Sequence, residues 1–346
     1  MLGKETKKYV VNGISNSSLS WFEVSPRYFK DNWDGTIERP DKSYLDVGTK
    51  THYFLLQPEE FNKLYTYLEY TTPRGEKQKQ FCEEYLNLKA KGKKKDDDAA
   101  ILAYEKTYVV SKKSKEKITE EALSLQKELS KYLQYLEASE QYKEVINYST
   151  LYYLESAKKA VQSHKLAKEL LLTEQPDFIE NDDLIIRNEY NILWKHPFIK
   201  IKNENALCSS TIDRMIIDHK NKKVTLVDLK TTYKLSKFHE ESFLNYKYYR
   251  QLAYYWMAIY YMFKTEFPDK DLNEYAKETY IVALQTNNSY TSDLPIECKV
   301  FKIGEDMLSR GEEEFTDLLT QLAWHFENDL WDHTKEYYEG DGSIKI

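Results

Sequence analysis

The sequence predicts an α/β protein in which a mixed central sheet is flanked by helices. Short segments rich in β-branched and aromatic residues alternate with segments whose apolar residues recur at helical spacing. The predicted strands cover residues 184–194, 209–217, 224–232, 278–285 and 296–303. The predicted helices around them cover residues 44–57, 241–264 and 304–328. Alternation of these two kinds of segment is typical of a sheet with helices packed on its faces.

A long helical segment interrupts this pattern. Residues 74–170 are rich in Lys, Glu and Leu at helical spacing, and they separate the first predicted helix from the first strand. At 346 residues the chain is long enough for one large domain or two small ones. We expect a single domain over 1–346, with a helical insertion at 74–170 and the core at 180–290.

Two neighbouring strands carry the residues of most chemical interest. The strands 209–217 and 224–232 can pair antiparallel across a short polar turn, which brings Asp213 close to Asp228. Lys230 lies two residues beyond Asp228 and therefore points to the same face of its strand. Carboxylates hold Mg²⁺, and an ammonium beside them can position the attacking water and favour its deprotonated form. These three residues together are typical of a metal-dependent phosphodiesterase.

A less specific explanation of the same residues is open. An Asp-x-Lys pair on a strand is most often an exposed ion pair, and Asp213 alone could be a polar residue at a strand end. Leu226, Val227 and Leu229 predict, however, that the second strand is buried. A buried carboxylate that has neither a partner nor a metal is costly, so burial favours a functional site.

The first predicted helix and the first strand add two candidates. Gly48 and His52 lie four residues apart on one face of a helix that ends before Pro58. A small residue one turn from an imidazole allows close packing beside a metal ligand, although a lone helical His is more often a core residue. Glu189 lies in the middle of the strand 184–194, which is an unusual position for a carboxylate unless it points at a cation.

The helix at 241–264 adds another pair. Gln251 and Tyr255 are four residues apart and share one of its faces. The same helix is crowded with other tyrosines, so a simple aromatic core helix would explain it as well.

The order of these motifs resembles the PD-(D/E)xK nuclease superfamily. In chain order the motifs are Gly48-x-x-x-His52, Glu189-x-x-Ile192-x-Trp194, Asp213, Asp228-x-Lys230-Thr231-Thr232 and Gln251-x-x-x-Tyr255. Within the superfamily, the chain is similar to the exodeoxyribonuclease VIII (RecE-type) branch found in phages and prophages. The runs 14–19 and 25–29 are also similar to the start of that branch. The resemblance covers roughly residues 12–60 and 180–290, and it implies a restriction-endonuclease-like catalytic core.

The resemblance implies a metal-binding role for five residues. His52, Asp213 and Asp228 would coordinate Mg²⁺, for which Mn²⁺ can substitute, and the backbone carbonyl of Leu229 would be a further ligand. Glu189 would bind or orient the metal and its water. These roles come from the family and are expectations for this chain.

The remaining motifs are implied to act on water and substrate. Lys230 would activate the attacking water, while Gln251 and Tyr255 would brace the site and contact the DNA backbone. The chain departs from the family pattern at Ile212, where a Pro or another turn residue is common, and at Asp228, where many members have Glu. Neither departure removes a chemical group that the reaction needs.

The activity implied by the resemblance is a Mg²⁺-dependent exonuclease that acts on the ends of linear duplex DNA, from 5′ to 3′, and produces 3′ single-stranded overhangs for recombination. Family members often form homo-oligomeric rings and work with a single-strand annealing protein, so we expect both kinds of partner. Two alternatives stay open: a catalytically silent DNA-end-binding or assembly protein on the same fold, and an endonuclease or repair nuclease. No G-x-x-x-x-G-K-[ST] phosphate loop occurs, which argues against a helicase activity in this chain.

Charge is distributed unevenly along the chain. The 50 Lys and Arg residues and the 57 Asp and Glu residues give a net charge of −7, which counts against DNA binding. The segment 220–237, however, contains many lysines and a single acid, Asp228. Lys222 and Lys223 are candidates for phosphate contact, and Tyr233 is a candidate for stacking on a base. A solvated hairpin explains the lysines equally well, and tyrosines more often fill cores.

Cysteine content and hydropathy exclude several classes of protein. Cys82, Cys208 and Cys298 are far apart and odd in number, which predicts neither a disulfide framework nor a zinc or iron–sulfur cluster. No apolar run reaches membrane-spanning length, and the N-terminal residues lack the apolar core of a signal peptide. We therefore expect a soluble, intracellular protein with no membrane partner, and the resemblance implies the cytoplasm of a bacterial host cell.

Overall fold

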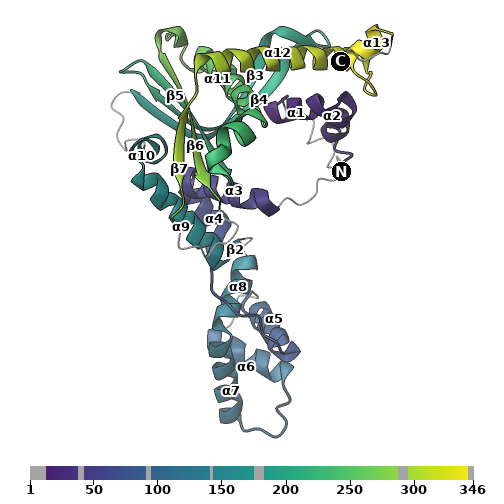
Figure 1. Cartoon of the computed structure of the whole chain (residues 1–346). Helices are drawn as coiled ribbons and strands as arrows, with labels where there is room; N and C mark the ends of the chain where they lie inside the picture. Colours follow the sequence, from purple (N-terminus) through teal and green to yellow (C-terminus); the bar gives the residue numbers. More distant parts are fainter. Residues whose placement is uncertain are drawn as a thin grey trace. The chain divides into compact units, whose positions relative to one another are not determined.

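The structure, a computed structural model, describes residues 13–37, 43–90, 95–140, 143–174, 183–286 and 295–341 (Figure 1). The chain forms two compact units. The first, called here the sheet unit, comprises Met1–Gln57 and Ser156–Ile346, and the second, the helical unit, comprises Pro58–Glu155. The helical unit shares residues 74–155 with the predicted insertion.

A five-stranded mixed sheet forms the centre of the sheet unit, with the strand order β3-β4-β5-β6-β7. Its members are β3 (Leu184–Ile201), β4 (Glu204–Asp218), β5 (Lys223–Thr232), β6 (Ala276–Gln285) and β7 (Cys298–Lys302). β5 and β6 are parallel, and the other neighbours are antiparallel. The predicted α/β class, with a mixed sheet flanked by helices, is confirmed.

Helices cover both faces of this sheet. The helices of this unit are α1 (Asn16–Val24), α2 (Pro26–Trp33), α3 (Ser43–Leu56), the second half of α9 (Tyr148–Ser163), α10 (Lys165–Leu172), α11 (Tyr248–Glu266), α12 (Glu305–Asn328) and α13 (Lys335–Glu339). Of these, α2 packs on α1 and α13 packs on α12. Short 3-10 turns occur at Leu235–Lys237 and Leu272–Glu274. α11 and α12 pack on each other and on β3, while α3 contacts β4 and β5. Leu226 and Val227 point to opposite faces of β5 and both are fully buried, as expected for a strand covered on both sides.

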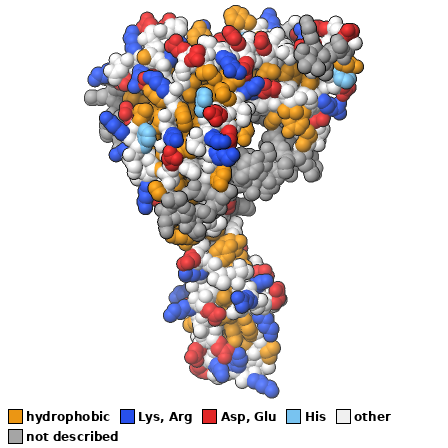
Figure 2. All heavy atoms as spheres, in the orientation of Figure 1, with side chains coloured by type: hydrophobic (Ala, Val, Ile, Leu, Met, Phe, Trp, Pro, Cys, Tyr) orange, Lys and Arg blue, Asp and Glu red, His pale blue; other side chains and the backbone are white. Residues whose placement is uncertain are grey.

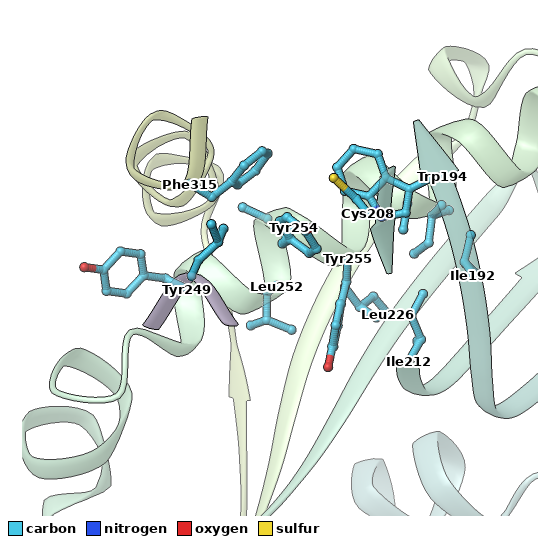
Figure 3. Close-up of a cluster of buried hydrophobic side chains, with 14 of the residues drawn as sticks. Ile192, Trp194, Cys208, Ile212, Leu226, Tyr249, Leu252, Tyr254, Tyr255 and Phe315 are labelled. Atoms are coloured by element: carbon cyan, nitrogen blue, oxygen red, sulfur yellow. The ribbon is translucent and has the colours of Figure 1, made fainter. Parts of the chain in front are cut away.

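The main hydrophobic core lies between the sheet and α11 (Figure 3). The Tyr254 ring packs edge-on against Trp194 of β3 at 5.0 Å and against Phe315 of α12 at 5.2 Å. Tyr254 has no exposed surface. Much of the tyrosine content of α11 therefore fills a core, as the less specific explanation of this helix predicts.

The predicted helix at 241–264 is wrong at its start. A π-helix at Phe238–Leu244 comes first, then Lys247 adopts a left-handed backbone with a φ of 52°, and α11 begins at Tyr248. The Lys247 ammonium is bound by Glu23 and Glu314, which come from α1 and α12. Because these partners are distant in sequence, the helical spacing alone could not reveal the break.

The helical unit has a small core of its own. Its helices are α4 (Pro58–Leu64), α5 (Glu76–Ala90), α6 (Asp96–Thr107), α7 (Lys115–Glu128), α8 (Ser130–Glu140) and the first half of α9 (Tyr148–Ser163). β1 (Tyr65–Tyr67) and β2 (Glu144–Ile146) pair in parallel. Phe81, Cys82 and the small residues Ala99 and Ala103 let α5 and α6 pack closely. Among the described residues of both units, no helix is long and apolar enough to cross a membrane.

Candidate active site and metal centre

The candidate site lies at the point in β4 where the buried residues switch from one face of the strand to the other. Along β4 the buried residues alternate up to Ile212, then Asp213 and Arg214 are also buried, and the alternation resumes in the opposite phase at Met215. Glu189 lies opposite Asp213 in the β3–β4 register and has a left-handed backbone with a φ of 46°. Such a backbone is rare for a residue other than Gly, and strained positions of this kind often occur at functional sites.

Helix α3 is fixed beside this irregularity. The Asn188 side-chain amide donates to the carbonyl of Leu56 at 2.8 Å, and its oxygen accepts from Arg214 at 2.8 Å. A Cβ atom on Gly48 would lie only 3.2 Å from the Thr231 hydroxyl oxygen, so α3 passes very close to β5. The predicted use of a small residue here is therefore supported, although the residue it admits is Thr231.

His52 of α3 lies among three oxygen acceptors. Its Nδ1 atom is 2.9 Å from Glu189 Oε1 and 3.9 Å from Asp213 Oδ1. Its Nε2 atom is 2.9 Å from the carbonyl oxygen of Leu229. The ligand atoms of His52, Glu189 and Asp213 all lie within 4.8 Å of one another. This spacing is compatible with a shared metal ion.

The electrostatics of His52 follow from these neighbours. Burial lowers the pKa of its imidazole, but the carboxylates of Asp213 and Glu189 outweigh burial and raise it. Both ring nitrogens face acceptors, so both contacts are hydrogen bonds only when the ring is doubly protonated. The imidazolium then supplies positive charge to the acidic cluster.

Asp228 and Lys230 form a buried ion pair beside this cluster. The Lys230 ammonium donates to Asp228 Oδ1 at 2.9 Å. Asp228 Oδ2 lies 2.9 Å from the same ammonium as an ion pair. It is buried, and it accepts no hydrogen bond from the described residues. Burial raises the pKa of Asp228, although the nearby Lys230 ammonium opposes this shift. Burial alone would lower the pKa of Lys230, but the carboxylates of Asp228 and Asp213 outweigh burial and raise it. The Lys230 side chain therefore stays protonated at neutral pH.

The other aspartate is also held by the main chain. Asp213 Oδ2 accepts a hydrogen bond from the backbone N–H of Leu229 at 2.7 Å, which ties the diverging ends of β4 and β5 together. The backbone carbonyl of Leu229 faces His52. The Leu229 peptide therefore presents its oxygen to the cluster, as the family resemblance implies.

Helix α11 brings the predicted pair Gln251 and Tyr255 to the acidic cluster. Gln251 donates to the Tyr255 hydroxyl at 2.6 Å, and Figure 3 shows this hydroxyl directed away from the hydrophobic cluster. Burial, and then the carboxylates of Asp213 and Asp228, raise the pKa of Tyr255. The predicted pair thus lies next to the acidic cluster, with a protonated phenol.

His52, Glu189, Leu229 and Lys230 line a cavity of about 680 Å³, whereas Asp213, Asp228, Gln251 and Tyr255 lie behind its walls. Several lining side chains have no place in the sequence motifs: Thr49, Tyr53, Gln57, Thr211 and Tyr248. Thr49, Tyr53 and Gln57 follow one another at intervals of four, the first two within α3, which carries His52, and the third directly after its last residue. That spacing is the signal that could have identified them. Tyr248 carries no such signal, because its spacing matches that of an ordinary core helix. In the structure its ring lies 5.0 Å from Lys230 Nζ.

The donor set suits a hard divalent cation. Its converged part is the imidazole of His52 and the carboxylates of Glu189 and Asp213. The Leu229 carbonyl lies beside His52, and the Asp228 carboxylate is outside that group but interacts electrostatically with Asp213 and His52. Oxygen donors of this kind are the ligands of Mg²⁺ and Mn²⁺. Asp228 Oδ2, which is buried without a hydrogen bond and lies 2.9 Å from the Lys230 ammonium, is a ligand atom of the required type. The residues present therefore fit the metal that the resemblance implies.

Three predicted substrate contacts lie apart from the cluster. Lys222 and Lys223 are five or more residues from Asp228 along β5, or about 17 Å for an extended strand. Their ammonium groups pair with Glu274 at 2.6 Å and Glu278 at 3.5 Å. Tyr233 follows the strand and is 55% exposed. The structure does not bring these residues into the cavity.

The surface gives no single basic patch in the view of Figure 2. Acidic and basic side chains are interspersed over the visible face. The lysines of the segment 220–237 illustrate this, because Lys234 and Lys237 both pair with Glu241. The local positive charge predicted from the sequence is thus partly balanced by acids from other segments.

Comparisons with known proteins identify no family. Neither the protein-family models nor the curated proteins contain a match to this chain. Among solved structures, the chain is similar to a crystal structure of a candidate exonuclease from Eubacterium rectale, with 9% sequence identity and a TM-score of 0.45. The similarity covers 97% of this chain and 91% of that chain. At this level it assigns no activity, which leaves the chemistry of the site as the ground for a function.

Proposed function

We propose that this chain is a Mg²⁺-dependent deoxyribonuclease that degrades linear duplex DNA from its ends, 5′ to 3′, and leaves 3′ single-stranded overhangs for recombination. The observation that carries the nuclease proposal is the convergence of His52, Glu189 and Asp213 beside the buried Asp228–Lys230 pair. A site with three carboxylates and one ammonium suits phosphodiester hydrolysis, where negative charge develops on the phosphate.

The residues of the site would have two roles, metal binding and orientation of the attacking water. Asp213, Asp228 and the Leu229 carbonyl would hold the cation, with His52 as a nitrogen ligand and Glu189 beside it. When bound, the cation supplies neutralisation of phosphate charge and a lower pKa for water. Because Lys230 stays protonated, its part is to donate a hydrogen bond that orients the attacking water, rather than to remove a proton from it.

The cavity supports a substrate that enters by its end. Its volume of about 680 Å³ lies in the range of pockets that enclose one small ligand, so it can take a terminal nucleotide. The ground for the 5′ to 3′ polarity, for a homo-oligomer and for a single-strand annealing partner is the family resemblance alone. These finer points are proposed together with the activity and are tested separately from it.

Cleavage of end-labelled DNA tests the proposal. Purified protein with Mg²⁺ should release nucleotides from linear duplex labelled at the 5′ end and should leave covalently closed circles intact. Lys230→Ala should abolish release, whereas Lys277→Ala, which removes an exposed lysine of the neighbouring strand β6, should not. Cleavage of circles would indicate an endonuclease instead. Tight binding of DNA ends without any release would indicate the silent end-binding protein.

A further inference from the structure

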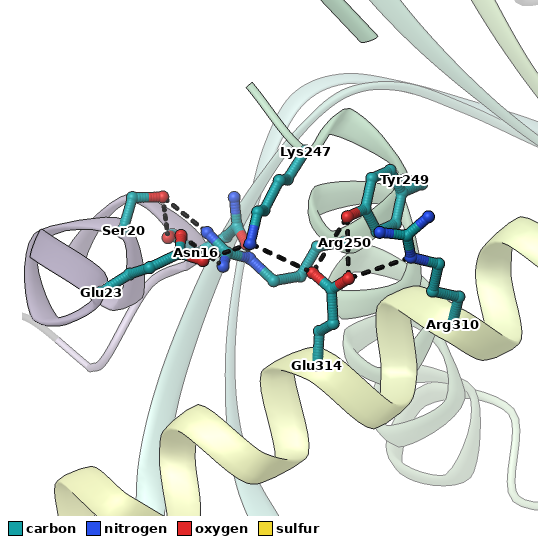
Figure 4. Close-up of polar contacts among 8 residues, drawn as sticks. All are labelled: Asn16, Ser20, Glu23, Lys247, Tyr249, Arg250, Arg310 and Glu314. Atoms are coloured by element: carbon teal, nitrogen blue, oxygen red, sulfur yellow. Dashed lines mark hydrogen bonds and ion pairs between the residues drawn. The ribbon is translucent and has the colours of Figure 1, made fainter. Parts of the chain in front are cut away.

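A buried arginine lies directly before Gln251 in the first turn of α11. The Arg250 side chain is 1% exposed. It donates from Nε to Asn16 Oδ1 at 3.1 Å, from Nη2 to Ser20 Oγ at 2.7 Å and from Nη1 to Glu23 Oε2 at 3.0 Å (Figure 4). All three acceptors belong to α1. A planar guanidinium with three fixed acceptors on one helix has little freedom to move.

A second carboxylate extends the contacts to α12. Glu314 accepts from the Tyr249 hydroxyl at 2.8 and 3.0 Å and lies 3.6 Å from the Lys247 ammonium, which also donates to Glu23 (Figure 4). We call the six residues that link the three helices the α11 clamp: Asn16, Ser20, Glu23, Lys247, Arg250 and Glu314. Arg310 donates to Glu314 from the outer side and is 57% exposed, so it lies outside the clamp.

The main chain of α12 presses on the same turn. A Cβ atom on Gly311 would lie 2.5 Å from the Tyr249 carbonyl oxygen and 2.9 Å from Arg250 Cα. Any side chain there would displace one of the two helices. This close contact is independent of the ion pairs, and it also fixes the first turn of α11.

The clamped turn carries residues of the candidate site. Tyr248 lines the cavity and places its ring 5.0 Å from the Lys230 ammonium. Gln251, three residues later, bonds Tyr255 on the next turn. The position of these side chains relative to β5 therefore depends on how the first turn of α11 is held.

We propose that Arg250 is a positioning residue, which holds the Tyr248 ring over Lys230 through the α11 clamp and so keeps the ammonium protected at Asp228. The inference rests on the proposed function only in the role that it gives Lys230. The protection of the ammonium is a property that can be measured without any catalytic activity.

The test is the rate at which Lys230 reacts with an amine-acylating ester, measured by peptide mass spectrometry with exposed Lys220 as the internal standard. Arg250→Lys keeps the charge but cannot make the three hydrogen bonds of the guanidinium to α1. The relative labelling of Lys230 should rise about fivefold or more, because the first turn of α11 unfolds locally more often. The matched control Arg310→Gln should stay within about twofold of wild type. Each variant is labelled at the same interval below its own melting temperature.

An unchanged protection of Lys230 in folded Arg250→Lys would overturn the proposal. Should that variant fail to fold, Glu23→Gln removes the charged acceptor with little change of shape and replaces it in the same assay, with the same two outcomes. DNA cleavage adds a second readout: turnover should fall about tenfold in Arg250→Lys while Mg²⁺ affinity stays constant, because the metal ligands lie on other elements. A wild-type protein that cleaves no DNA would refute the nuclease function and leave the labelling result intact.

Discussion

The candidate site and the α11 clamp are two polar clusters of the same unit, and they differ in how charge is balanced. The clamp has two carboxylates, Glu23 and Glu314, and each is paired with cations. The site has three carboxylates, and one oxygen of Asp228 is buried without a hydrogen bond. A cluster with more acid than donors suits a cation, whereas a balanced one holds helices together.

The pKa shifts make the same distinction. Burial alone would raise the pKa of Glu23, but Lys247 and Arg250 outweigh it, so the pKa is lowered and the charge stabilises the fold. In Asp228 burial prevails over Lys230, so the pKa is raised and the charge opposes folding. We therefore expect acids of the two clusters to respond in opposite ways to neutralisation.

Asp228→Asn should have the largest effect on activity, and it should not lower the stability of the metal-free protein. The amide keeps the shape but loses the charge that binds the cation, so cleavage should fall by about 10³-fold or more. Without metal, the variant should unfold at the same urea concentration as wild type or a higher one. It should also bind DNA at least as tightly, since repulsion of phosphate is reduced. Clear destabilisation of the metal-free protein would erase the difference between the clusters.

His52→Ala distinguishes a metal ligand from a structural histidine. A ligand predicts a loss of cleavage of about 10²-fold, with partial recovery in Mn²⁺, because Mg²⁺ gives up its hydration water more reluctantly at a site that has lost one ligand. A structural histidine predicts a loss of about 1–3 kcal/mol in the free energy of unfolding and unchanged activity per folded molecule. Melting temperature and specific activity measured on one preparation decide between the two, and a destabilised but fully active variant would remove His52 from the site.

Glu23→Gln should destabilise the protein by about 1–2 kcal/mol at neutral pH, allowing for the partial exposure of this side chain. Because the folded pKa of Glu23 is lowered below its usual 4.5, its contribution is complete above that pH and is lost as the pH falls through the folded value. Urea unfolding of wild type and variant at pH 7 and at acid pH should show the difference shrinking. A difference that does not depend on pH would mean that the carboxylate charge contributes little.

Replacing both Lys222 and Lys223 with Ala should have the smallest effect. Both lysines pair with glutamates away from the cavity, so cleavage of short duplexes should change by about twofold or less. If they contact phosphate, binding should weaken for all sequences and its salt dependence should flatten. Binding measured over a series of salt concentrations separates these outcomes.

The sequence predicted the sheet well because its signals are local. The strands around Asp213 and Asp228 are short runs rich in aliphatic and β-branched residues, and their polar turn is short, so pairing and the shared face of Lys230 follow directly. The helix that carries His52 is likewise marked by its own spacing and by Pro58.

The features that were missed depend on long-range contacts. The phase change at Asp213 coincides with the left-handed backbone of Glu189 on the neighbouring strand, which no propensity indicates. The break at Lys247 and the burial of Arg250 depend on α1, more than 220 residues earlier in the chain. The positive charge predicted for residues 220–237 was also too high. The acids that pair with these lysines lie outside that segment.

A crystal structure with Mn²⁺, located by its anomalous scattering, tests the central claim most directly. One ion should be bound by Asp213, Asp228 and the Leu229 carbonyl, with the neutral imidazole of His52 as a further ligand. The contrary result is a cavity in which His52 still bridges Glu189 and Leu229 at saturating Mn²⁺, with no anomalous peak beside Asp228.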